Sequence, residues 1–165
     1  MNFNRIDDMR KEGFEGFVPI CDLQALDCRD VPDSPGVYLV LRTTTSPPEF
    51  ILEGTGGHFK GRNPNKAIAC LKDRWVDGTV VTYVGKAGGL GRATLLTRLR
   101  QFTRFGLGKN VGHWGGRYIR QLRDSRDLLV CWKVTGNLVP RDVEKELIGA
   151  FTKRHSKPPL ANLRR

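Results

Sequence analysis

Five side chains stand in short patterned contexts spread along the chain, and their types suit chemistry on a phosphate ester. Two are tyrosines, in the tripeptides Gly-Val-Tyr and Tyr-Val-Gly. They are followed by an arginine, a glutamate three residues before Leu-Ile, and an asparagine in Pro-Leu-Ala-Asn. In chain order these residues are Tyr38, Tyr83, Arg98, Glu144 and Asn162. Hydrolysis of a phosphodiester needs a positioned water, positive charge for the pentavalent transition state and help for the leaving oxygen.

The segments around these residues predict strands and helices that would hold them in place. Runs rich in β-branched and aromatic residues contain the two tyrosines and predict strands. Leucines at helical spacing with arginines between them predict an amphipathic basic helix around Arg98, and a proline starts the helix that contains Glu144. The expected strands are 37–42, 79–84 and 128–134, and the expected helices are 66–72, 95–102, 118–122 and 140–153.

Length and element order predict one α/β or α+β domain. The 165 residues suffice for a single core, and this order of elements predicts a small central sheet of about three strands flanked by helices. Residues 1–33 are an acidic lead-in, of which 1–16 are expected to be loose and 17–33 docked. Residues 34–165 form the main domain, with an insertion over 46–78 that is rich in Gly, Pro and Asn.

The charge distribution predicts a polyanionic partner. The net charge is +11, although the lead-in holds eight acids against four bases, so the remainder of the chain carries +15. No acid occurs between Asp77 and Asp124, where nine bases lie. Because a long stretch of one sign costs self-repulsion in a folded domain, a nucleic acid is favoured over a merely basic surface.

Several classes of protein are disfavoured by composition. No apolar stretch approaches the length of a membrane span, and the polar start lacks the apolar core of a secretory signal, so we expect a cytoplasmic protein without a membrane partner. The four cysteines show no metal-ligand spacing. The run around Lys86, GKAGGLG, matches neither a P-loop nor GxGxxG, so no nucleotide cofactor is expected.

Taken in order, the five motif fragments resemble the GIY-YIG nuclease superfamily. Its pattern is GIY or GVY, then YIG or YVG, an arginine on the next helix, a glutamate in an E-x-x-L-I helix and a late asparagine. The similarity covers residues 35–163. It implies a mostly antiparallel sheet and a metal-dependent endonuclease that hydrolyses phosphodiester bonds in DNA, with RNA not excluded.

Three departures from the family pattern stand out. Tyr38 and Tyr83 are 45 positions apart, whereas the family usually joins these strands by a short connection, so the insertion must loop out and return. Arg92 competes with Arg98 for the arginine role. Many members carry a histidine one helical turn after the arginine; here that position is Phe102, and His113 could substitute for it or be structural.

The resemblance assigns a role to each matched residue. Tyr38 would be the general base or orient the water, with its pKa lowered by nearby positive charge, and Tyr83 would support the water or the phosphate. Arg98 would neutralise the phosphate, Glu144 would hold one Mg²⁺ or Mn²⁺ ion, and Asn162 would fix the geometry of the site. Further bases are candidates for nucleic-acid binding: Lys86, Arg92, Arg100, Arg104, Lys109 and Arg117.

Plainer interpretations stay open for most of these residues. Tyrosines on strands often only pack in the core. Helical position alone does not distinguish Glu146 from Glu144, and an asparagine in a terminal loop is ordinarily a turn residue. Trp114, beside His113, could stack on a base or pack under its loop, and packing is favoured. The alternative functions are a non-catalytic nucleic-acid-binding module and a scaffold for a protein partner; DNA specificity and oligomeric state are undetermined.

Overall fold

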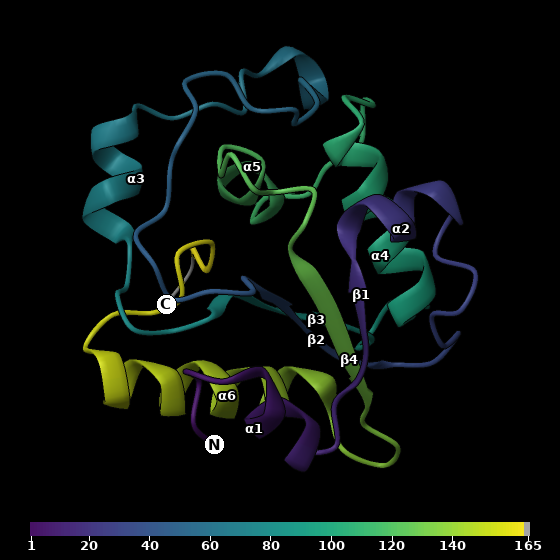
Figure 1. Ribbon diagram of the computed structural model, residues 1–165. Helices are drawn as coiled ribbons and strands as arrows, with labels where there is room; N and C mark the ends of the chain where they lie inside the picture. Colours follow the sequence, from purple (N-terminus) through teal and green to yellow (C-terminus); the bar gives the residue numbers. More distant parts are fainter. Residues whose placement is uncertain (164–165) are drawn as a thin grey trace.

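An antiparallel sheet runs through the centre of the protein, whose computed structural model describes residues 1–163 (Figure 1). Within those residues it has four strands, in the order β1-β4-β2-β3. Their bounds are β1 Glu15–Pro19, β2 Gly36–Leu41, β3 Val81–Ala87 and β4 Leu129–Val134. The predicted α+β fold is confirmed, with the three expected strands in place and β1 added at one edge.

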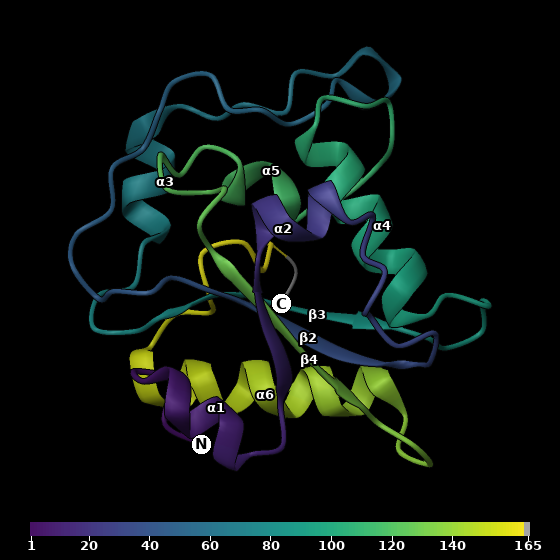
Figure 2. The same ribbon diagram turned by 45° about the vertical axis from the view of Figure 1, so that its right-hand side comes forward.

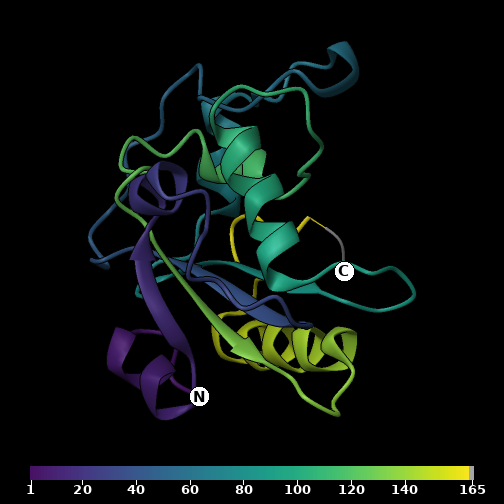
Figure 3. The same cartoon turned by 90° about the vertical axis from the view of Figure 1, so that its right-hand side faces the viewer.

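Helices cover both faces of the sheet, which explains why β2 is buried along its whole length (Figures 1 and 3). On one face lie α1 (Ile6–Lys11) and α6 (Pro140–His155); on the other lie α2 (Ile20–Ala25), α4 (Leu95–Gly106) and α5 (Gly116–Ile119). Successive β2 residues alternate between the two resulting cores: Leu39 packs on the α6 side, and Tyr38 on the α4 side. No helix within residues 1–163 is long and apolar enough to cross a membrane.

The α4 helix begins where its sequence signals indicate. Thr94 and Thr97 form a capping box, in which the Thr97 N–H donates to the Thr94 hydroxyl over 3.2 Å. The Thr94 hydroxyl also donates to Asp33 of the lead-in over 2.7 Å. The leucines at helical spacing, Leu95 and Leu99, are fully buried. Arg104 lies on the exposed side of α4, whereas Arg98 and Arg100 are half-buried.

The expectation that residues 1–16 are loose is wrong. This segment forms α1 and the first two residues of β1, and β1 pairs with β4. Phe3 and Met9 are fully buried, and the Phe3 ring packs edge-on against Phe151 of α6, with centroids 5.1 Å apart. These few apolar side chains anchor a segment whose average composition is polar, because burial of each large side chain contributes about 1.5–3 kcal/mol.

The insertion between the two tyrosine strands does loop out and return, since β2 and β3 pair directly with Tyr38 opposite Gly85. It contains the 3₁₀ turn Phe59–Gly61 and α3 (Ile68–Arg74), and it lies over α5 and the end of α4 (Figure 2). The buried side chain of Gln121 holds the insertion in place through two hydrogen bonds to the Lys66 backbone. It donates to the Lys66 carbonyl over 2.8 Å and accepts from the Lys66 N–H over 2.7 Å.

The insertion also contacts the loop that follows α4. The Gly57 N–H donates to the carbonyl of Phe105, in the last turn of α4, over 2.9 Å, and the Lys60 N–H donates to Asn110 of the following loop over 3.2 Å. The loop over residues 107–115, which carries His113 and Trp114, is therefore braced from outside by the insertion.

Candidate active site

A cleft of about 1490 Å³ lies beside β3, between α4 and α6, and its walls are strongly basic. It collects side chains from segments far apart in sequence. Tyr83 and Lys86 come from β3, Arg98, Arg100 and Arg104 from α4, Arg141, Glu144 and Lys145 from α6, Trp114 from the 107–115 loop, and Asn162 from the C-terminal segment. Four of the five motif residues thus border one cleft, and the fifth, Tyr38, lies beneath it.

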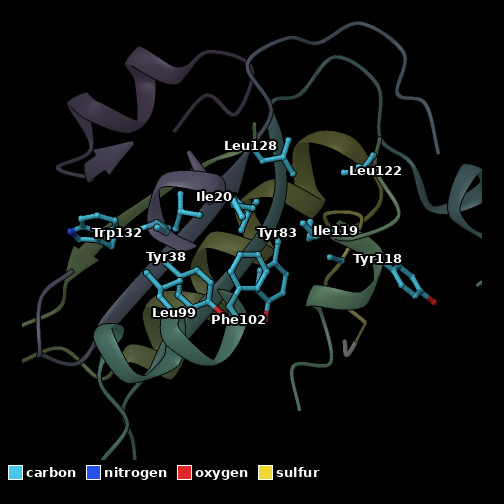
Figure 4. Packing of buried hydrophobic residues seen from close by; sticks show 14 of the residues in the cluster. Ile20, Tyr38, Tyr83, Leu99, Phe102, Tyr118, Ile119, Leu122, Leu128 and Trp132 are labelled. Carbon is cyan, nitrogen blue, oxygen red and sulfur yellow. The ribbon is translucent and has the colours of Figure 1, made fainter. Parts of the chain in front are cut away.

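The two tyrosines project from the same face of neighbouring strands. Their ring centroids are 5.8 Å apart in an edge-on arrangement beside Phe102 (Figure 4). Gly85 stands opposite Tyr38 in the register, and a Cβ atom there would collide with the Tyr38 ring and hydroxyl. A Cβ at Gly115 would likewise meet the Tyr83 ring. The glycine of Tyr-Val-Gly therefore makes room for the other tyrosine.

His113 is a buried partner of Tyr38. Its Nε2 lies 3.0 Å from the Tyr38 hydroxyl, and its Nδ1 accepts the Gly116 N–H over 2.9 Å. Burial lowers the histidine pKa well below 6.5, and Arg98 and Arg120 lower it further, so the ring is neutral. Because Nδ1 accepts, the single ring proton sits on Nε2 and is donated to Tyr38.

His113 also packs on Phe102, with ring centroids 4.9 Å apart. The histidine thus reaches the tyrosine pair from the loop after α4 rather than from α4 itself. His113 contacts a motif tyrosine but is buried and does not border the cleft, so a role in the site and a structural role both stay predictions.

The expected lowering of the Tyr38 pKa is wrong for this geometry. Complete burial raises the Tyr38 pKa well above 10, the Tyr83 hydroxyl raises it further, and Arg98 opposes both. Burial also raises the Tyr83 pKa, against the lowering effect of Arg98. Desolvation of a phenolate therefore outweighs the basic surroundings. The two phenols differ in access, because Tyr38 is fully enclosed while Tyr83 is 9% exposed and borders the cleft.

Glu144 and Glu146 are no longer equivalent once α6 is packed. Glu144 is half-buried in the cleft wall, whereas Glu146 is exposed and off the cleft. Burial raises the pKa of Glu144, and the positive charges of Lys86, Arg98 and Arg141 oppose this rise. The packing of α6 thus places the Glu144 carboxylate in the basic cleft and leaves the Glu146 carboxylate outside it.

The carboxylate of Glu144 has the character needed to hold a hard cation. Within residues 1–163 its oxygens make no hydrogen bond and no ion pair, so both are available to a ligand. No group of three or more potential metal-ligating side chains occurs in that range. Mg²⁺ is commonly held by one or two carboxylates and keeps several waters, so Glu144 and the open cleft fit one such ion.

Arg98 is central among these groups. It is half-buried, and its Nη1 donates to Gln101 over 2.6 Å. Its charge acts on both tyrosines, on His113 and on Glu144. Arg92, its rival in the sequence, is exposed on the preceding loop and does not border the cleft.

Asn162 uses its side-chain amide within the fold. Its Oδ1 accepts the Val84 N–H over 3.0 Å, and its Nδ2 donates to the Val84 carbonyl over 2.7 Å. The Ala161 N–H donates to the Thr82 carbonyl over 3.0 Å. The C-terminal segment is thereby attached along β3 at Thr82 and Val84, on either side of Tyr83.

The remaining basic candidates divide into two groups. Lys86, Arg100 and Arg104 border the cleft, but Asp27 of the lead-in pairs with Arg100 at 3.2 Å and Arg104 at 3.8 Å. The acidic lead-in thus offsets part of the cleft's charge. The second group is outside the cleft: Lys109 is exposed on its loop, and Arg117 lies over the Trp114 ring at 3.6 Å.

Four charged or aromatic cleft residues were missed or misjudged by sequence reasoning: Arg141, Asp142, Lys145 and Trp114. Arg141 precedes Glu144 by three residues on α6, a helical spacing that was a usable signal for it, whereas Lys145 directly follows Glu144 and had no such signal. Trp114, for which packing was favoured, is 52% exposed in the cleft wall. No local pattern distinguishes it from a packed tryptophan, because its exposure depends on the path of the whole loop.

Replacing His113 with glutamine is expected to reduce the acid sensitivity of the fold. Since the folded-state pKa lies well below 6.5, the unfolded chain binds a proton below pH 6.5 while the folded protein does not. The wild-type unfolding free energy should then fall by up to about 1.4 kcal/mol per pH unit as the pH drops below that value. Urea unfolding at several pH values from 7 to 5 measures the slope. The exposed His58→Gln variant serves as control, and equal slopes for His113→Gln and wild type contradict the expectation.

Comparison of the chain with protein-family models, with curated proteins and with solved structures finds no match. The class of protein therefore has to be inferred from the fold and from the side chains gathered at the cleft.

Proposed function

We propose that this protein is a metal-dependent endonuclease of the GIY-YIG type that hydrolyses phosphodiester bonds in DNA. The observation that carries the proposal is the convergence of Tyr38, Tyr83, Arg98 and Glu144, from four separate elements, at one basic cleft. Chance matches to short motifs have no reason to meet in space. The basic walls suit a phosphate backbone, whose binding is dominated by Lys and Arg.

In this proposal each residue acts through the contacts described above. Tyr83, the phenol on the cleft wall, contacts the attacking water, and Tyr38 supports it from beneath with its hydroxyl held by His113. Arg98 provides positive charge for the scissile phosphate, and Glu144 holds the metal ion. A bound Mg²⁺ ion would polarise the phosphoryl oxygens and neutralise developing charge.

One observation favours a second candidate, a nucleic-acid-binding module that keeps the fold without turnover. Both phenols have raised pKa values, so each carries its proton at neutral pH and very little phenolate is present to act as a base. Such a module would bind DNA in a strongly salt-dependent way and would cut no substrate. The uncommitted carboxylate of Glu144 supports the enzyme instead, because binding an anion gains nothing from a half-buried acid in the cleft.

Incubation with supercoiled, linear, single-stranded and branched DNA, with Mg²⁺, with Mn²⁺ and with chelator, tests the proposal. We expect nicking or cutting of at least one substrate with either metal and none with chelator. Mapping the cut positions then separates sequence-specific from structure-specific cleavage. Salt-sensitive binding of DNA without cleavage of any substrate would establish the binding module, and absence of binding at low salt would reject both.

A further inference from the structure

Trp114 is an exposed aromatic ring placed at the cleft. Its side chain is 52% exposed, whereas Trp132 is buried in the core. The residues on either side of it are fixed: His113 is hydrogen-bonded beneath the cleft, and Gly115 packs against the Tyr83 ring. The indole thus lines the same cleft as the proposed reactive tyrosine, on a loop that the insertion contacts.

The Arg117 side chain covers one face of the Trp114 ring. Its guanidinium carbon lies 3.6 Å from the Trp114 ring centroid, within the range of a cation–π contact. This contact covers one face and limits the motion of the indole, so the opposite face is the one available to a ligand. An ordered ring loses less conformational entropy on binding than a mobile one.

The surroundings of Trp114 select the chemistry of that ligand. The exposed ring borders a cleft lined by Lys86, Arg98 and Arg141. A ligand that matches both the indole ring and the basic cleft has a flat aromatic face and anionic groups, as a nucleotide within a strand does. In a regular duplex each base face is covered by its neighbours, so only an unstacked base can offer a face to the indole.

We propose that Trp114 is a stacking platform for one unpaired base, and that the protein prefers DNA carrying such a base, in a bulge, flap or junction, over fully paired duplex. The proposal rests on the proposed function in that the base belongs to the strand lying in the same cleft. Arg117 is a positioning residue that holds the indole. Stacking on an aromatic side chain is sequence-tolerant, so the preference is for DNA structure rather than base identity.

Fluorescence of 2-aminopurine tests this preference. Two otherwise identical duplexes carry the probe either base-paired or in a one-nucleotide bulge, and binding is measured without added divalent metal so that no cleavage occurs. The wild-type protein should bind the bulged duplex about tenfold more tightly than the paired one and quench the bulged probe. Trp114→Ala should abolish the preference and the quenching, while Trp114→Phe should retain most of both.

A matched control is Leu52→Ala, which removes another exposed apolar side chain, 68% exposed, from the insertion, off the cleft. It should behave as wild type. An unaltered preference and quenching in Trp114→Ala, or a wild-type protein without any preference, overturns the proposal. Lack of metal-dependent cleavage together with a Trp114-dependent preference rejects the proposed nuclease activity and leaves the stacking platform standing. Glu144-dependent cleavage without that preference rejects the stacking platform alone.

Discussion

Glu144→Gln should lower metal-dependent DNA cleavage by about a thousandfold or more while leaving the affinity for DNA equal or slightly higher. The loss follows because a neutral amide is a poor ligand for Mg²⁺, and a metal ion contributes several kcal/mol of charge stabilisation to the transition state. The affinity should not fall, because the substitution removes a negative charge from a basic cleft. Single-turnover cleavage and fluorescence anisotropy measure the two quantities separately.

The same helix provides the control for this experiment. Glu146→Gln makes an identical chemical change two residues away, at an exposed position off the cleft. It should cleave DNA at nearly the wild-type rate. Undiminished cleavage by Glu144→Gln, or equal losses in both variants, would falsify the assignment of Glu144 as the metal ligand. A loss of cleavage should not result from a less stable fold, since Gln removes a half-buried charge whose burial is unfavourable, as the raised pKa of Glu144 indicates.

The second large effect concerns the tyrosine pair. Tyr83→Phe should slow cleavage by about a hundred- to ten-thousandfold, the usual contribution of a general base. Its pKa is raised by burial, so the fraction of phenolate grows about tenfold per pH unit below that pKa, and the wild-type rate should rise with pH across the neutral range. The variant should be slow and nearly independent of pH. A rate–pH profile measured under single-turnover conditions checks both expectations, and an unchanged profile in Tyr83→Phe removes this tyrosine from proton transfer.

Tyr38→Phe provides the comparison, because the two phenols are expected to differ in stability as well as in rate. Removing the Tyr38 hydroxyl leaves the buried Nε2–H of His113 without its acceptor, which costs about 1–3 kcal/mol. Tyr83 borders the cleft, where a water molecule can occupy the place of the hydroxyl that Tyr83→Phe removes. Urea unfolding should therefore show a clear loss for Tyr38→Phe and little change for Tyr83→Phe. The reverse order contradicts the arrangement in which Tyr38 lies beneath Tyr83.

Much of the sheet and of α4 could be predicted from local patterns. The three strands expected from β-branched and aromatic runs are present, although β3 extends to Ala87, beyond the expected end at Val84. The leucine spacing of α4 marks its buried face directly. Residues 1–16 of the lead-in were mispredicted because their fold depends on isolated anchors such as Phe3, whose partner Phe151 lies at the other end of the chain. Local composition carries no signal for such a contact.

The sequence by itself determined which residue types are available for chemistry and their order along the chain. It also determined the surplus of basic residues and the α+β class of the fold. Only the tertiary structure decided which glutamate enters the cleft, which tyrosine borders it, and that Trp114 is exposed there. The reason is that helical spacing and strand alternation are local properties, whereas burial depends on segments that meet from distant parts of the chain. The raised pKa values of the tyrosines follow from the same cause, because the desolvation that overrides their basic neighbours exists only in the packed protein.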